Sequence, residues 1–243
     1  MKELGQLSTE TMSTLTIGDV VAKDYRTAQV FEKYGIDFCC GGNIALATAC
    51  QEKGIDPQEL GRELGKALDQ PIDRSQNYAA WELPFLADYI VNTHHVYLKE
   101  NTSVIAAYAR KIAQVHGAHH PEVIEIAAIF DKIAADMELH LIEEEEKLFP
   151  AIRKIDALKK AGAAHDAKDV EELRALLETL GHDHDEIGAA IHEIRRLAKD
   201  YAIPADVCNT FMVTYEKLNE FEDDLHKHVH LENNILFPKA GKL

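Results

Sequence analysis

The residues best suited to chemistry in this chain form a motif that occurs twice. One copy begins at His140 and the other at His228, and both read H-x-x-x-E-x-x-x-L-F-P, which places the carboxylates at Glu144 and Glu232. In an α-helix, residues four apart lie on one face. Each copy therefore directs an imidazole and a carboxylate to the same side. Two such pairs facing each other would form a nitrogen and oxygen cage for metal ions.

Helical periodicity predicts the elements that must position these groups. Apolar residues recur at i, i+3, i+4 and i+7, and alternating runs typical of strands are nearly absent. The apolar stripes span residues 83–112, 123–148, 173–194 and 211–235. Each stripe carries one histidine: His94, His140, His184 and His228. Because the connectors are short, we expect an antiparallel four-helix bundle.

The chain divides by composition into three predicted parts. Residues 1–71 contain short helical pieces broken by glycines, and we expect a small helical domain with a Cys39-Cys40-Gly-Gly turn at its surface. Residues 72–79 are mostly polar and predict a linker. Residues 80–243 hold the four stripes and form the predicted bundle. The two Phe-Pro steps fall late in their helices and are expected to bend or end them just past the motif.

Metal binding best explains why the motif residues continue the apolar stripes. A buried carboxylate is costly unless it is paired or bound to a metal. We expect Glu144 and Glu232 to bridge two metal ions, with the four stripe histidines as terminal ligands. Imidazole and carboxylate suit iron, manganese or zinc and disfavour copper(I). Six protein ligands for two ions leave positions open for an oxo, hydroxo or water bridge and for O2 or NO.

Simpler interpretations apply to the other candidates. A single histidine on an apolar stripe is usually a core residue, and only the repeated motif favours metal here. Asp136 precedes His140 by one turn and is either an orienting carboxylate or an exposed residue. Four of the remaining histidines are expected at helix ends: His116, His119, His120 and His165. Four others are expected off the stripes: His95, His182, His226 and His230. His192 lies two turns past His184 and is expected at most to contact a ligand.

Composition limits the class of protein. The 243 residues are 46% hydrophobic, which is enough for a core, and the net charge of −16 argues against nucleic acid or an anionic membrane as the main partner. The chain start lacks the apolar run of a signal peptide, and no apolar stretch reaches the ~20 residues that span a bilayer. We therefore expect a cytoplasmic protein with reduced thiols.

The four cysteines are too few for a disulfide scaffold. Cys39 and Cys40 are adjacent and could form only a strained, easily reduced disulfide. They are either redox or iron-transfer thiols or two packed residues beside a turn. Cys50 and Cys208 are expected to be ordinary core residues.

Over nearly its full length the chain resembles the RIC (repair of iron centres) proteins, which are iron–sulfur cluster repair di-iron proteins. The resemblance rests on Thr16-Ile-Gly-Asp, Asp37-Phe-Cys-Cys-Gly-Gly, Thr93-His94, the two H-x-x-x-E motifs and His184-Asp-Glu-Ile-Gly188. It implies a hemerythrin-like bundle holding two non-haem iron ions with an oxo or hydroxo bridge. It also implies cytoplasmic repair of clusters damaged by nitrosative and oxidative stress, by iron donation or NO chemistry. Damaged iron–sulfur proteins would be the partners, and a homodimer is expected.

Two other functions compete with repair. One is a hemerythrin-type protein that binds or senses O2 or NO. Oxygen-carrying hemerythrins have a second histidine four residues after the one on the third helix, and this chain has Gly188 there. The other is a di-iron oxidase of the ferritin-like kind, which the reversed order of histidine and glutamate disfavours.

Overall fold

A computed structural model describes residues 9–69, 76–164 and 166–243. Over these residues the chain is helical with no strand, and Thr16 and Ala45 form an isolated bridge. None of the helices in these ranges combines the length and the hydrophobicity that spanning a bilayer requires. The predicted all-α fold is confirmed.

The chain separates into two compact units. One contains Met1–Leu86 with His226–Lys242, and the other contains Ala87–Leu225 with Leu243. The predicted boundary at Pro71 and residues 72–75 of the predicted linker lie outside the described residues. The division into 1–71, 72–79 and 80–243 thus stays a prediction. No sequence pattern predicted that His226–Lys242 would group with the N-terminal residues.

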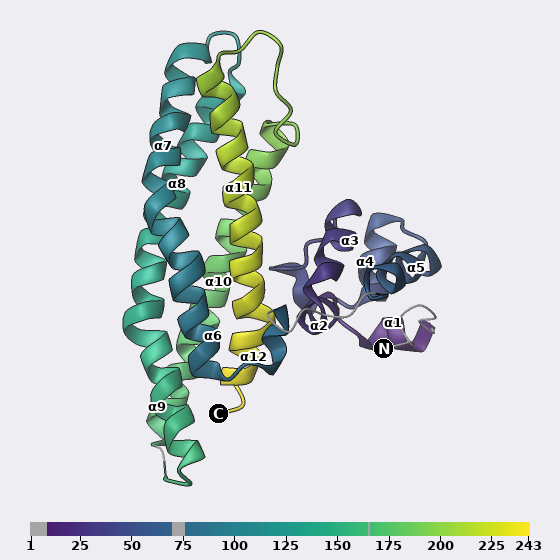
Figure 1. The fold of residues 1–243 in the computed structure, drawn as a ribbon, viewed down its shortest axis with the longest axis vertical. Coiled ribbons are helices and arrows are strands. Elements are labelled where there is room, and N and C mark those ends of the chain that lie inside the picture. Colours follow the sequence, from purple (N-terminus) through teal and green to yellow (C-terminus); the bar gives the residue numbers. More distant parts are fainter. Residues whose placement is uncertain (1–8, 70–75, 165) are drawn as a thin grey trace. The chain divides into compact units, whose positions relative to one another are not determined.

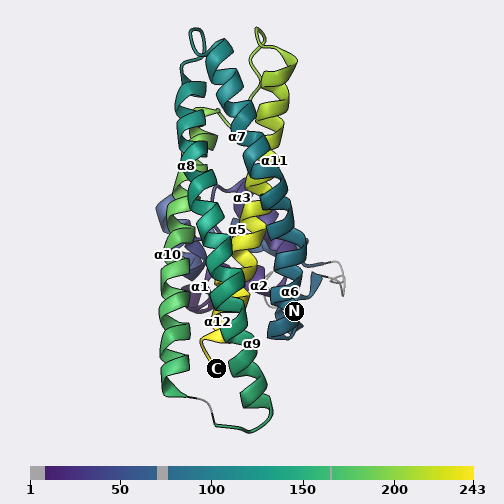
Figure 2. The same ribbon diagram turned by 90° about the vertical axis from the view of Figure 1, so that its left-hand side faces the viewer.

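The unit Ala87–Leu225 is a bundle of long helices (Figures 1 and 2). It contains α7 (Val96–His116), α8 (Glu122–Glu143), α9 (Phe149–Lys160), α10 (Ala167–Leu197) and the part of α11 (Asn209–Leu231) that precedes His226. α6 (Leu83–Ile90) leads into α7, while α9 continues α8, so that four rods result. α8 packs against α7 and α10. The predicted four-helix bundle is confirmed.

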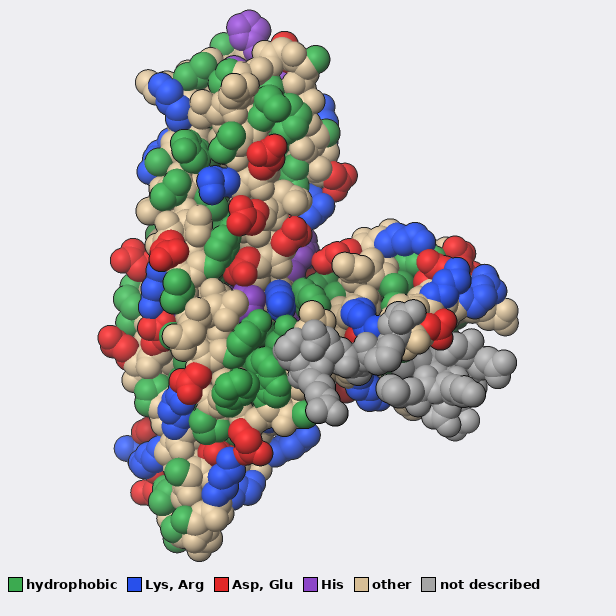
Figure 3. Space-filling view, viewed as in Figure 1, with side chains coloured by type: hydrophobic (Ala, Val, Ile, Leu, Met, Phe, Trp, Pro, Cys, Tyr) green, Lys and Arg blue, Asp and Glu red, His purple; other side chains and the backbone are tan. Residues whose placement is uncertain are grey.

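The bundle core consists of the predicted stripes. Leu98, Phe130 and Ile191 are fully buried, and the rings of Phe130 and Phe221 meet edge to face with centroids 5.0 Å apart. Such aromatic pairs add to the stabilisation from apolar burial. On the face of the molecule seen in Figure 3, acidic and basic side chains mix with exposed hydrophobic ones.

Three π-helical turns interrupt the helices at the predicted ligands. They are η6 (Val91–His95), η7 (Glu144–Leu148) and η8 (Glu232–Leu236). A π turn accommodates one extra residue and is frequent at functional sites. η7 and η8 each end directly before a Phe-Pro step. Pro150 does not end its helix, because the chain continues as α9 to Lys160, whereas α12 (Phe237–Ala240) is short.

The N-terminal part of the other unit consists of short helices, and side chains cap the starts of two of them. The helices are α1 (Thr9–Thr14), α2 (Ile17–Lys23), α3 (Ala28–Lys33), α4 (Leu46–Lys53) and α5 (Pro57–Ala67), with 3-10 turns at Tyr25–Thr27 (η2), Gly41–Asn43 (η3) and Tyr78–Ala80 (η5). Thr16 and Asp19 form a reciprocal capping box at α2. Asp56 accepts a bond from the Gln58 N–H at α5, where the sequence predicted a start. Phe31, Leu46 and Leu60 form the core.

The C-terminal segment of this unit inserts one side chain between glycines. A Cβ added to Gly18 or Gly42 would overlap the amide oxygen of Asn234, and one on Gly18 would also come within 2.9 Å of the Gly42 carbonyl oxygen. α2 packs against η3 and η8 in the same place. Glycine at positions 18 and 42 therefore makes room for the Asn234 amide.

Replacing Gly18 by alanine tests this packing. Gly18→Ala should lower the free energy of unfolding by about 1–3 kcal/mol, the usual cost of overpacking a filled site. The matched control is Gly181→Ala on α10, where nothing lies within 4 Å of an added Cβ. Alanine there should raise stability by up to about 1 kcal/mol, because glycine is a poorer helix former. Urea denaturation measures both, and equal effects would contradict the account.

Candidate metal centre

Four buried groups with metal-binding chemistry gather inside the bundle unit. His95 ends η6, His140 lies on α8, Glu144 begins η7 and His184 lies on α10. Their residues are between 0 and 3% exposed. All four are ionisable, and burying them together requires compensation from one another or from a cation.

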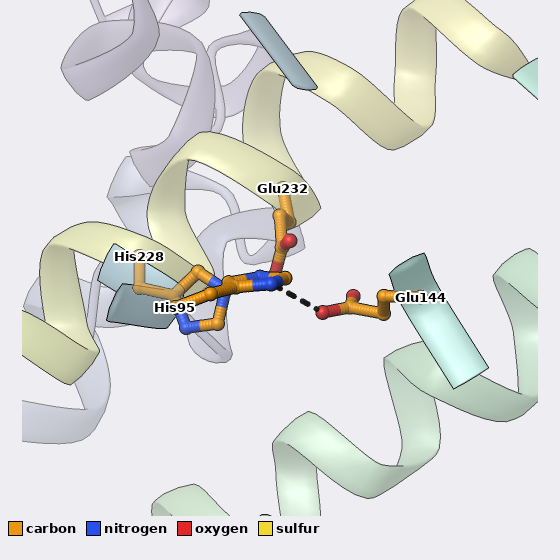
Figure 4. A group of neighbouring side chains, drawn as sticks. All are labelled: His95, Glu144, His228 and Glu232. Carbon is orange, nitrogen blue, oxygen red and sulfur yellow. Dashed lines mark ion pairs between the residues drawn. The ribbon is translucent and has the colours of Figure 1, made fainter. Parts of the chain in front are cut away.

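The Glu144 carboxylate lies at the centre of this group. Its Oε1 is 3.5 Å from His140 Nε2 and 4.0 Å from His184 Nε2, while its Oε2 is 3.3 Å from His95 Nε2. Figure 4 shows His95 and Glu144 pointing toward one another. The two oxygens of one carboxylate thus face different imidazoles, as expected of a carboxylate that bridges two ions.

The second motif copy is folded in the same way. His228 Nε2 is 3.1 Å from Glu232 Oε2, and both residues are fully buried. Figure 4 shows the two side chains leaving one stretch of helix. The spacing of four residues therefore brings the imidazole and the carboxylate together in each copy, as the sequence predicted.

The structure places His95 beside Glu144, where the sequence led us to expect His94. Counting four residues from the buried Ile90 gives His94, but the π turn Val91–His95 adds one residue and gives His95. His94 is also buried, and its Nδ1 lies 2.9 Å from Asp224 Oδ1. The periodicity argument assumed an uninterrupted α-helix and so missed His95.

Two of these imidazole rings, those of His95 and His140, each have a carboxylate beside the Nδ1 atom. His95 Nδ1 lies 2.7 Å from Glu145 Oε1, and the Lys99 ammonium bonds both oxygens of Glu145. Burial alone would raise the pKa of Glu145, but the bonds from Lys99 and His95 outweigh it and lower that pKa. His140 Nδ1 lies 3.4 Å from Asp183 Oδ2. Metal-bound histidines commonly donate their second N–H in this way.

Three simpler predictions have clear outcomes. Asp136, considered as an orienting carboxylate, is exposed, and Asp183 lies beside His140 instead. His182 is exposed near Glu186, as expected for a residue off the stripe. His230, also expected off the stripe, is fully buried, and burial lowers its pKa to about 3.

The donor set fits a cation. His140 Nε2 and His184 Nε2 lie 3.0 Å apart. Two nitrogens bound to one ion at about 2.1 Å in adjacent positions would lie about 3 Å apart. Neutral imidazoles whose Nδ1 atoms donate outward present lone pairs on Nε2, and the carboxylate supplies negative charge. The buried Glu222 carboxylate differs from that of Glu144, because it accepts hydrogen bonds from the Arg195 guanidinium and the Tyr201 hydroxyl.

Comparison with known proteins matches both parts of the chain. Residues 86–240 match the hemerythrin HHE cation binding domain, and residues 14–68 match a domain of unknown function, DUF542. The iron-sulfur cluster repair protein ScdA of Staphylococcus haemolyticus is 31% identical over 223 residues, covering 92% of this chain and 96% of that protein. The chain belongs to the iron–sulfur cluster repair family.

Other members of this family show similar agreement. The iron-sulfur cluster repair protein YtfE of Enterobacter sp. is 30% identical over 92% of this chain and 95% of its own length. A probable iron-sulfur cluster repair protein of Haemophilus influenzae is 30% identical over 87% of this chain and 90% of its own length. The hemerythrin HHE match covers all the predicted metal ligands, and cation binding is the property that its description states.

The DUF542 domain contains the adjacent cysteines. Cys39 is buried and Cys40 is half-buried, so the turn does not expose both thiols as predicted. Their sulfurs lie 3.8 Å apart, and no disulfide joins them. The neighbouring Cys40 sulfur, burial and the Asp37 carboxylate together hold the pKa of the Cys39 thiol well above its usual range.

An exposed thiol with a lowered pKa lies elsewhere in the chain, directly before α11. Cys208 was expected in the core but is exposed, and its sulfur lies 3.1 Å from His116 Nε2. The bond to His116, aided by the backbone N–H groups of Phe211 and Thr210, lowers the pKa of Cys208 to about 7. The proximity of the two residues depends on the fold, so the sequence carried no signal for it.

Alkylation kinetics test this assignment. At pH 7 iodoacetamide should label Cys208 first, with a rate that rises to half its maximum near pH 7, because the thiolate is the nucleophile. His116→Ala should move the midpoint toward the ordinary value and slow labelling at pH 7 by about tenfold. Mass spectrometry of the labelled peptides gives the rates. Equal labelling of Cys208 and Cys50 in the native protein would refute the assignment.

Proposed function

We propose that this chain is a di-iron protein that repairs iron–sulfur clusters damaged by nitrosative and oxidative stress, by iron donation or NO chemistry at the di-iron centre. The observation that carries the proposal is the buried Glu144 carboxylate, whose oxygens face different imidazoles. The names of the relatives supply the repair function. Damaged iron–sulfur proteins are then its clients, and the cytoplasm its location.

The proposed ligands are the four bundle groups and the second motif pair. They are His95, His140, Glu144, His184, His228 and Glu232. Two facts support treating them as one centre. The hemerythrin HHE match runs without interruption over residues 86–240, and α11 is one continuous helix from Asn209 to Leu231. Imidazole and carboxylate ligands suit iron, and two glutamates can each bridge.

The protein groups have distinct roles around the proposed ions. Bound iron would supply redox chemistry and open positions for NO or O2. Glu145 and Lys99 fix the His95 ring, and Asp183 faces the outer nitrogen of His140. Gly188 is buried one turn after His184 and has no side chain to act as a further ligand. Fewer ligands favour reactivity and iron release over stable O2 storage.

Metal content tests the bridging role of Glu144. Glu144→Ala should lose both ions, because each carboxylate oxygen is assigned to a different ion. The measurement is iron per chain by elemental analysis after purification without oxygen. His182→Ala is the control and should retain full iron, since that imidazole is exposed. Full iron in Glu144→Ala would rule out the bridge.

The choice between the adjacent histidines can be settled directly. His95→Ala should lower iron content markedly, because the ring facing Glu144 is removed. His94→Ala should bind more iron than His95→Ala, since its ring contacts Asp224. If His94→Ala is the more depleted of the two, the sequence-based assignment of His94 is the better one. Circular dichroism would show that both variants fold.

A repair assay separates the proposed function from O2 or NO sensing. A [4Fe–4S] protein is damaged with NO and then incubated with the iron-loaded chain, without added iron. Return of the cluster absorbance and client activity is expected with the native chain but not with Glu144→Ala. Failure of a fully loaded chain to restore the client would favour a hemerythrin-type binding protein.

A further inference from the structure

We propose that Asp37, Cys39 and Cys40 form a second cation site, suited to a single ferrous or zinc ion bound by two thiolates and a carboxylate. The site lies in the DUF542 domain and does not share ligands with the proposed di-iron centre. The evidence for this site is its own geometry. Its use as a transient binding site for iron during repair rests on the proposed function.

One turn brings the three groups together. Asp37 Oδ1 accepts from the backbone N–H groups of Cys39, at 2.9 Å, and Cys40, at 3.0 Å, and lies 3.2 Å from Cys39 Sγ. One potential ligand atom from each of the three residues lies within 4.8 Å of the others. The backbone bonds hold the carboxylate in place beside both thiols.

The sulfur spacing is that of two thiolates on one ion. Two sulfurs bound at about 2.3 Å in tetrahedral positions lie about 3.8 Å apart. The distance between Cys39 Sγ and Cys40 Sγ is 3.8 Å, far beyond the ~2.05 Å of a disulfide. Soft thiolates with one carboxylate select zinc or iron among divalent metals. Three protein ligands also leave a fourth position open for solvent or a receiving ligand.

The turn is held by the helix segment that carries the second iron-binding motif. Asn234 Nδ2 donates to the Phe38 carbonyl at 3.0 Å, and Asn233 Nδ2 lies 3.3 Å from the Cys39 carbonyl. Both asparagines directly follow Glu232. The buried His230 ring packs on Phe38 with centroids 6.0 Å apart. One π-helical stretch thus carries a proposed di-iron ligand and, in the next two residues, the anchors of the thiol turn.

These contacts define how the site would work. Binding of a divalent ion displaces one proton from each thiol, and Asp37 binds as the carboxylate, so no oxidant or reductant is needed. The buried Cys39 would hold the ion, while the half-exposed Cys40 leaves it open to ligand exchange with a client. A ferrous ion would pass through the site by exchange of ligands, with its oxidation state unchanged.

Cobalt(II) titration of the reduced full-length protein tests the site. The native chain should show a near-ultraviolet thiolate-to-cobalt charge-transfer band that saturates at one equivalent. Cys40→Ser should abolish the band. Asp37→Asn preserves the Oδ1 acceptor and the turn, and should weaken binding by roughly tenfold or more through loss of a charged ligand. Cys50→Ser, at a buried thiol outside the turn, is the control and should leave the band unchanged.

The same titration in Glu144→Ala separates the two proposals. The thiolate band should persist in that variant while the bundle loses its metal. No band in the native chain, or an undiminished band in Cys40→Ser, would overturn the second site. A thiolate band in a native chain that binds no iron in the bundle would leave the second site standing and remove the di-iron function.

Discussion

The burial of the Glu144 carboxylate among imidazoles is the constraint on which the rest of the structure depends. A carboxylate with no exposed surface is unfavourable unless positive charge reaches it. Its two oxygens face His95 on one side and His140 and His184 on the other. The long helices matter because rods fixed by an apolar core can hold polar groups from four helical elements in so small a space.

The π-helical turns determine which residues of the long helices face the proposed site. Each of the three turns begins or ends at a proposed ligand, namely His95, Glu144 or Glu232. In η8 the same turn also presents Asn233 and Asn234 to the cysteine turn of the DUF542 domain. One local departure from α-helical geometry therefore carries both a proposed metal ligand, Glu232, and the two asparagines that contact the cysteine turn.

The sequence predicted the helices and buried residues that follow a regular repeat. It did not predict features that depend on an irregular turn or on contacts between distant residues. Periodic apolar residues identified the four rods and placed His140, Glu144 and His184 in the core. The same four-residue spacing pointed to His94 rather than His95, because no residue type in the sequence marks the extra residue of a π turn. Cys208 and His116 are far apart in sequence, so their contact could not be predicted from spacing. The grouping of His226–Lys242 with the N-terminal helices involves side-chain packing such as that of Asn234 against Gly18.

The central claim is that the chain binds two bridged iron ions. The most direct test is the Mössbauer spectrum and iron content of native protein purified without oxygen and then oxidised. The account predicts about two irons per chain in a diamagnetic, antiferromagnetically coupled pair. A single iron per chain, uncoupled ferric signals or stoichiometric zinc in its place would contradict it.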